Sequence, residues 1–202
     1  SADAYTIGNS NLTPSDAFRF ARGEEVVSEI GVKAKLRVPL DFLMVSDHAT
    51  YLGIFKRIEN RDPKILKTSL GKRWRKYMDN NDSRLFTEFV DGLNGNQEQS
   101  FEKSDYIPIW KDITENVDKF NEPGVFTALI GYEWTPAPTG DNLHRVVVFK
   151  GDAKTAQKII PFSAIDSDKP EDLWKFLEKY NSSTGGEAIS ISHNSNISGG
   201  RM

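Results

Sequence analysis

Two short apolar runs, residues 40–45 (LDFLMV) and 125–130 (VFTALI), most constrain the fold of this 202-residue chain. Each has the length of a β-strand, and neither approaches the ~18 apolar residues that a membrane-spanning helix requires. Largely continuous apolar runs, as opposed to alternating ones, are typical of strands covered on both faces, as in parallel sheets. The sequence therefore predicts buried strands in a layered fold.

Helix signals lie between the strand candidates. Thr13-Pro14 forms an N-cap followed by a helix-compatible proline, and Gly23 marks a helix end. We expect further helices at residues 104–121 and from residue 170 onward, with Trp110, Trp174 and Phe176 in the core. The other strand candidates are residues 146–149 and 188–192, with a possible hairpin at residues 25–37. This alternation predicts an α/β fold with a mainly parallel sheet.

Composition excludes several classes of function. Basic residues number 26 and acidic residues 29, so the net charge of −3 argues against a generic polyanion-binding protein. The most basic segment, residues 64–76, is soon followed by acidic residues and is expected to be a solvated helix face, which leaves no strong nucleic-acid signal. With no cysteine, the chain has no disulfide, no Cys-ligated zinc and no thiol nucleophile.

The three histidines carry the main functional signal. His48 and His193 directly follow strand candidates, His144 precedes one, and Glu133 follows another. Since the carboxyl ends of parallel strands meet at one rim, these side chains are expected to converge, and His144 can reach the rim from a strand that runs the other way. Imidazole and carboxylate together suit Zn²⁺, Mn²⁺ or Fe²⁺. Taken singly, a histidine after a strand is more often a loop residue or a satisfied hydrogen-bonding group, and a Glu at a strand end is usually solvated.

Several motifs resemble those of the PHP (polymerase and histidinol phosphatase) superfamily. Residues 40–48 (LDFLMVSDH) resemble its apolar strand ending in Asp-His, and residues 131–134 (GYEW) resemble the strand that carries its metal-bridging Glu. His144 and His193 match its later histidine positions. Residues 12–23 and 128–135 are similar to a large, often exported bacterial branch of PHP-like proteins.

The resemblance implies a fold and a domain organisation. It implies that residues 1–202 are a fragment of one PHP-like domain, part of a distorted seven-stranded β/α barrel with a helical insertion at about residues 55–122. The first His-x-His strand and the C-terminal Asp-x-His strand of such a domain are expected outside this sequence. A periplasmic or exported location rests on the resemblance alone.

The resemblance also implies a metal-dependent phosphoesterase that acts on a small phosphate ester with a metal-activated water. Two or three divalent ions (Zn, Mn or Fe) would be held in the complete domain, with Glu133 bridging and His48, His144 and His193 as terminal ligands. Asp47 would orient a ligand or accept a proton, and weaker candidates for substrate binding are Arg145, Asn194 and Asn196. Hydrolysis of an amide or sulfate ester, and a non-catalytic binding role, stay open as alternatives.

Overall fold

The computed structural model describes residues 5, 11–93 and 101–201. Its helices are α2 (Pro14–Ala21), α3 (Ile54–Glu59), α4 (Ser69–Asp79), α5 (Arg84–Leu93), α6 (Lys103–Phe120), α7 (Ala153–Ala156) and α8 (Pro170–Thr184), with short 3-10 turns η1 (Ile65–Lys67) and η2 (Pro138–Gly140). Its strands are β1 (Val26–Val27), β2 (Lys33–Ala34), β3 (Phe42–Met44), β4 (Thr127–Trp134), β5 (Arg145–Lys150) and β6 (Glu187–Ser192). None of the described helices is long and apolar enough to cross a membrane.

The central sheet has four strands in the order β3-β4-β5-β6. Strand β3 is parallel to β4, whereas β5 is antiparallel to both of its neighbours. The expectation of a mainly parallel sheet is therefore wrong. Because β3, β4 and β6 all run opposite to β5, the carboxyl ends of these three strands meet the beginning of β5 at one edge.

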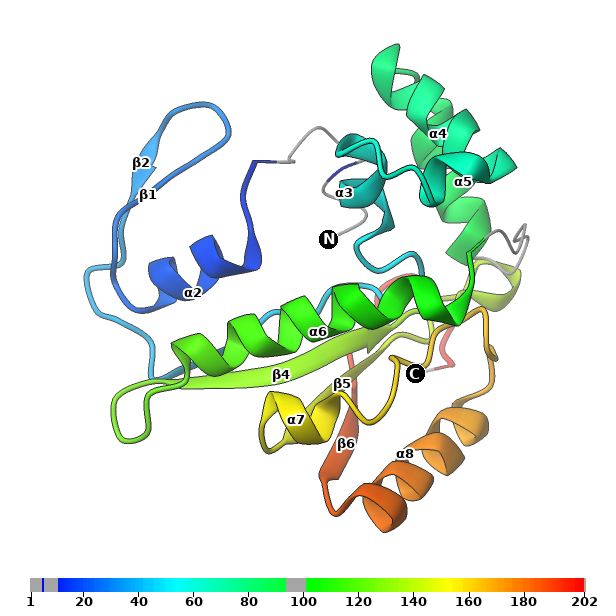
Figure 1. Ribbon diagram of the computed structural model, residues 1–202. Helices are drawn as coiled ribbons and strands as arrows, with labels where there is room; N and C mark the ends of the chain where they lie inside the picture. The colour runs from blue at the N-terminus through cyan, green and yellow to red at the C-terminus, as the bar shows by residue number, and fades with distance from the viewer. Residues whose placement is uncertain (1–4, 6–10, 94–100, 202) are drawn as a thin grey trace.

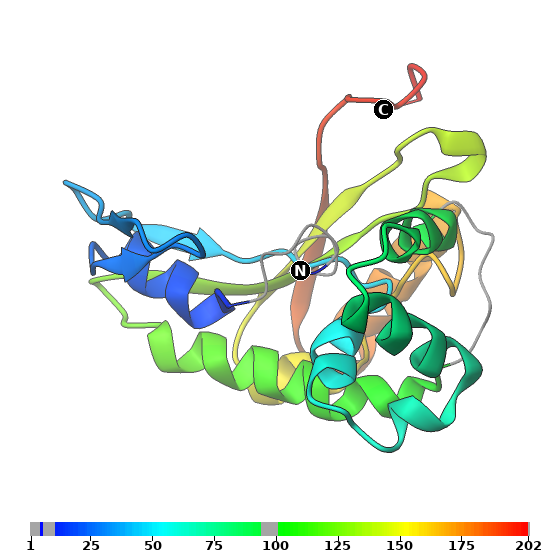
Figure 2. The ribbon, with the colours of Figure 1, turned by 90° about the horizontal axis from the view of Figure 1, so that it is seen from above.

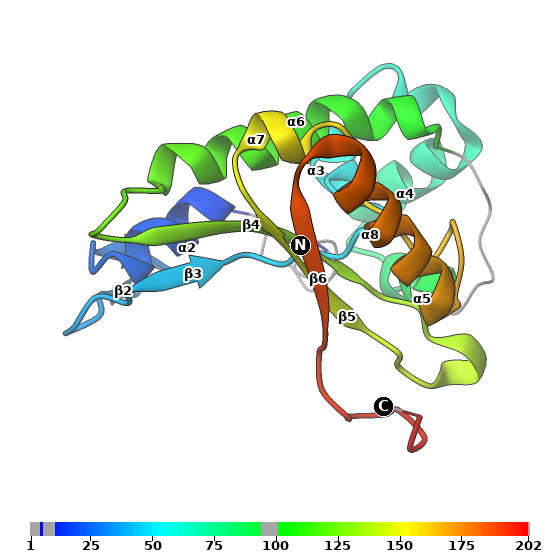
Figure 3. The same ribbon diagram turned by 90° about the horizontal axis from the view of Figure 1, so that it is seen from below.

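The seven-stranded barrel is also wrong. Within the described ranges the strands form an open four-stranded sheet and a separate two-stranded sheet, and no barrel closes. Helices α6, α7 and α8 lie on one side of the four-stranded sheet (Figures 2 and 3). On the other face, Phe42, Ile189 and Ile191 are half or more exposed. The expectation that these strands are covered on both faces is therefore also wrong for the described residues, because an apolar run fixes neither the cover of both faces nor the direction of the neighbouring strands.

The main core lies between the sheet and its helices. Strand β4 alternates, so that Ala128, Ile130, Tyr132 and Trp134 all enter this core. Trp110 of α6 packs edge-on against Tyr132, and its Nε1–H donates to the Ala156 carbonyl oxygen at 3.0 Å. The large aromatic side chains of β4 thus fix α6 and α7 on the sheet.

A second apolar cluster lies in the polar, helical part of the sequence. It is built by α3, η1, α4 and α5 around the stacked rings of Phe55 and Trp74. These helices lie near the start of α6, whereas α2 and the β1–β2 hairpin lie near its other end (Figure 1). The segment expected as an insertion, residues 55–122, thus combines a separately packed helical group with α6, which belongs to the main core.

Local signals in the sequence placed several element ends well. The predicted cap of α2 is present, since the Thr13 N–H donates to the Asp16 carboxylate at 2.8 Å in a capping box. Strands β1 and β2 pair as the expected hairpin, and α8 begins at Pro170 and ends before Gly185 in the left-handed region. Trp174 corrects one expectation, because it is 48% exposed and does not belong to the core.

This difference gives a stability test. We expect Trp110→Ala to lower the free energy of unfolding by about 3–5 kcal/mol, since the ring is fully buried and its hydrogen bond to the Ala156 carbonyl oxygen is lost as well. The matched change Trp174→Ala should cost less than about 1 kcal/mol. Urea unfolding followed by circular dichroism measures both, and equal losses would contradict the placement of the core.

Candidate metal centre

Three strand ends bring Glu133, His144 and His193 together. Trp134 at the end of β4 pairs with Arg145 at the start of β5, which pairs with Ser192 at the end of β6. The next backbone contact continues the ladder, because the His193 N–H donates to the His144 carbonyl oxygen at 3.1 Å. The register therefore places both histidines beside the end of β4, at the rim that the sequence predicted.

Backbone bonds also fix His48 at this rim. His48 forms an isolated parallel bridge with Glu133 beyond the end of β3. The Glu133 N–H donates to the Asp47 carbonyl oxygen and the Ala49 N–H donates to the Glu133 carbonyl oxygen, both at 2.8 Å. The loop after β3 is thereby held against β4, and its histidine cannot move far from Glu133 without breaking these bonds.

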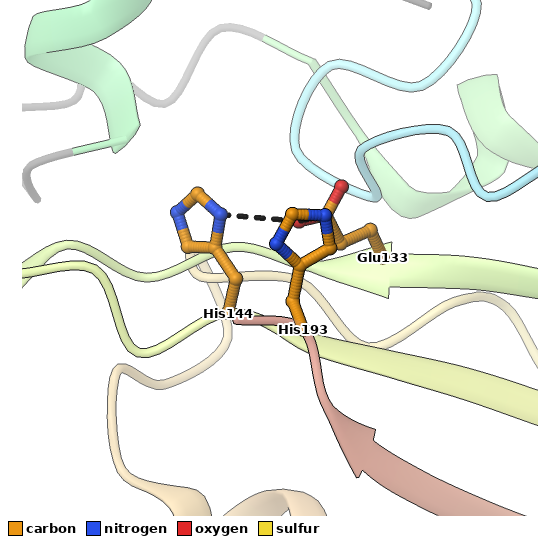
Figure 4. Close-up of side chains that lie close together, drawn as sticks. All are labelled: Glu133, His144 and His193. Carbon is orange, nitrogen blue, oxygen red and sulfur yellow. Dashed lines mark ion pairs between the residues drawn. The ribbon is translucent and has the colours of Figure 1, made fainter. Parts of the chain in front are cut away.

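All three imidazoles approach the carboxylate of Glu133. His144 Nδ1 lies 3.1 Å and His193 Nε2 lies 3.8 Å from Oε1, whereas His48 Nδ1 lies 3.6 Å from Oε2. Figure 4 shows His144 and His193 beside Glu133. Both oxygens of the Glu133 carboxylate thus have a histidine nearby. This is the arrangement expected of a carboxylate that belongs to two sets of metal ligands.

The burial of this cluster distinguishes it from polar side chains that lie together by chance on a surface. Glu133 is buried. Among the described residues, its Oε1 has imidazole nitrogens nearby but no hydrogen bond, and Nε2 of His144 has no hydrogen-bond partner. Buried polar atoms almost always have a partner, so these atoms suit an additional bound group. A carboxylate and two imidazoles are suitable donors for a divalent transition-metal ion.

The distances are compatible with an ion after a small adjustment. One ligand atom from each of Glu133, His144 and His193 lies within 4.8 Å of the others, so this group can hold a metal ion. Ligand atoms around a tetrahedral zinc ion at about 2.1 Å lie roughly 3.4 Å apart. His193 is the most exposed of the three, so its rotation is the least hindered way to close the group.

The remaining candidate residues lie around this cluster in different ways. Asp47 and His48 both line a pocket next to the rim. Asn194 and Asn196 are exposed, and the Asn196 N–H donates to Oδ1 of Asn194 at 3.1 Å, so they shape the loop after β6. Their predicted role in substrate binding remains a prediction.

Arg145 lies on the other face of the sheet from Glu133. It pairs with Trp134 in the antiparallel ladder, and directly paired residues project to the same face. Its Nη1 donates to the carbonyl oxygens of Leu143 and His144, both at 3.1 Å. Partial burial lowers the pKa of the Arg145 guanidinium. The structure thus does not bring this predicted substrate ligand to the cluster.

The sequence did not predict that the helical group of α3, η1, α4 and α5 contacts the candidate metal centre. Phe89 of α5 lies with its ring centroid 5.9 Å from that of His48. Phe89 belongs to the second apolar cluster. The helical group that forms this cluster therefore packs directly against His48, a candidate metal ligand. No local pattern around residue 89 signals this contact, which arises only from tertiary packing.

The fold and the site define a mixed α/β protein with a carboxylate–imidazole group that can hold a metal ion. The chain belongs to the family described as "Protein of unknown function (DUF3604)", whose model matches residues 1–202. Comparison with curated proteins found no match, and comparison with solved structures found none either.

Metal retention tests the site directly. We expect the chain, loaded with Zn²⁺ or Mn²⁺ and dialysed against metal-free buffer, to retain metal. Glu133→Gln removes the carboxylate that all three histidines face. It should weaken metal binding by more than roughly 10- to 100-fold, the loss typical when a residue that only contacts a metal ligand is changed. Elemental analysis measures the bound metal.

The matched control is Glu187→Gln, which changes an exposed carboxylate paired with Lys150 at the far end of β6. This variant should retain as much metal as the unchanged chain. Equal metal content in Glu133→Gln and Glu187→Gln would contradict the assignment.

Proposed function

We propose that this chain carries the metal site of a metal-dependent hydrolase, with phosphate esters as its substrates. The observation that supports this most is the position of Glu133, whose two carboxylate oxygens face histidines from separate segments of the chain. A carboxylate in that position suits a pair of ions, as used in many enzymes that hydrolyse phosphate esters.

The residues of the cluster have distinct roles in this proposal. Glu133, His144 and His193 would hold an ion, and His48, which faces Oε2 of Glu133, would serve as a further ligand. Bound divalent ions supply an activated water and stabilise negative charge on the phosphoryl oxygens. Asp47 is held beside the rim through its carbonyl oxygen, and its role in this proposal is to orient a ligand or accept a proton.

The lack of two common nucleophile signatures supports water as the attacking group. The sequence has no cysteine. It also has no Gly-x-Ser-x-Gly motif, the sharp turn that exposes a nucleophilic serine in α/β hydrolases. Attack by water is therefore the simplest mechanism for this site, and phosphate esters agree with the resemblance to PHP proteins.

An activity assay tests the proposal. The metal-loaded chain is expected to hydrolyse p-nitrophenyl phosphate, and both His48→Ala and Glu133→Gln should lower kcat/KM by about 100-fold or more, the size typical for loss of one electrostatic stabiliser. Glu187→Gln, with its unchanged cluster, should retain activity. Unchanged turnover in both cluster variants would refute the proposal.

A parallel assay distinguishes the bond that is broken. p-Nitrophenyl sulfate is a sulfate ester that releases p-nitrophenolate, as the phosphate does, and p-nitroacetanilide is an amide that releases p-nitroaniline. Hydrolysis of either in place of the phosphate would assign the site to another bond. Metal binding without hydrolysis of any of the three would favour a binding role.

A further inference from the structure

A pocket of about 330 Å³ adjoins the candidate metal centre. Asp47 and His48 form part of its wall, so the pocket and the Glu133 cluster share a boundary. The rest of the wall comes from Tyr5, from the start of α2, from α3 and the residues just before it, and from the middle of α6. The volume is at the lower end of the range of about 300–1,000 Å³ found for small-molecule sites.

The pocket is mostly apolar away from the metal side. Its apolar wall is formed by Leu12, Pro14, Leu52, Phe55, Ile109 and Ile113. Leu52 and Phe55 are buried members of the two apolar clusters, so this wall is supported from behind by packed side chains. Such a surface favours a hydrophobic group over a sugar or a second phosphate, whose polar atoms would lose water without gaining partners.

The charges at the pocket support the same conclusion. Lys56 is paired with Glu59 and Arg57 with Asp62, each at 2.7 Å, so both cations are neutralised. Asp112 also lines the pocket and would repel an additional anionic group. With an ion bound at the Glu133 cluster, the metal side beside His48 would be the part of the pocket that favours an anion.

We infer that this pocket binds the apolar, ring-sized group of the substrate ester. In combination with the proposed function, on which this inference rests, the substrate is a phosphate ester of a hydrophobic alcohol or phenol. The phosphate lies at the Glu133 cluster and the ring lies between α2, α3 and α6. The pocket determines which ester is accepted, and the cluster performs the hydrolysis.

Binding of two non-hydrolysable probes tests this inference. For the metal-loaded chain, calorimetry is expected to show phenylphosphonate binding about 10- to 100-fold more tightly than methylphosphonate, the gain expected from burying one aromatic ring. Leu12→Trp, which places a larger ring in the pocket, should reduce this preference to less than about threefold. Methylphosphonate should bind equally to both proteins.

Ile30→Trp is the matched control. Leu12 and Ile30 are 40% and 85% exposed, so either can change to Trp without disturbing the core, but Ile30 lies outside the pocket wall. The control is expected to keep the full preference for phenylphosphonate. Circular dichroism verifies that both variants fold.

A third probe separates this inference from the proposed function. Benzyl alcohol carries the ring without an anion, and we expect it to shift pocket resonances in NMR spectra of the metal-free chain, but not in Leu12→Trp. If benzyl alcohol binds while neither phosphonate does, the pocket stands as a ring site and the proposed function fails. If both phosphonates bind equally and benzyl alcohol does not bind, the pocket inference is refuted and the proposed function stands.

Discussion

The buried carboxylate of Glu133 is the constraint on which the rest of the site depends. Removing a carboxylate from water is unfavourable unless nearby groups compensate for its lost hydration. Here the compensating groups are imidazoles from three separate segments, and they reach Glu133 only because the ends of β4 and β6, the start of β5 and the loop after β3 meet at one rim. The mixed direction of the sheet is therefore a requirement of this cluster, since β5 must run backwards for His144 to precede it.

The helices and strands were largely predictable because their signals are local. A cap such as Thr13 or a continuous apolar run acts within a few residues, and these signals located α2, α6, α8 and the four central strands to within a few positions. Strand direction and barrel closure depend on contacts between distant residues, so the sequence alone did not reveal that the sheet is open and mixed. Trp174 shows the same limit, because helical spacing does not tell which face of α8 meets the sheet.

The residues of the site divide in the same way, into those with a local sequence signal and those that depend on contacts between distant residues. His48, Glu133, His144 and His193 could be singled out because each lies at the end of a strand candidate, and the structure brings all four together. Arg145 is a predicted substrate ligand because a guanidinium suits a bidentate phosphate contact, but the twofold alternation of a strand directs its side chain to the opposite face. The pocket wall and the contact of Phe89 with His48 could not be predicted, since they join segments from residue 5 to residue 113 that meet only in the folded chain.

His48 links the two parts of the proposed substrate site, because it belongs both to the cluster and to the pocket wall. The cations of that wall are already paired with Glu59 and Asp62, and Arg145 projects to the other face of the sheet. In the proposed site, attraction for the phosphate would therefore come mainly from bound ions, whereas the pocket would contribute non-directional apolar contact. Such a site separates the recognition of charge from the recognition of shape, so the ester group can vary in size without any change to the residues around Glu133.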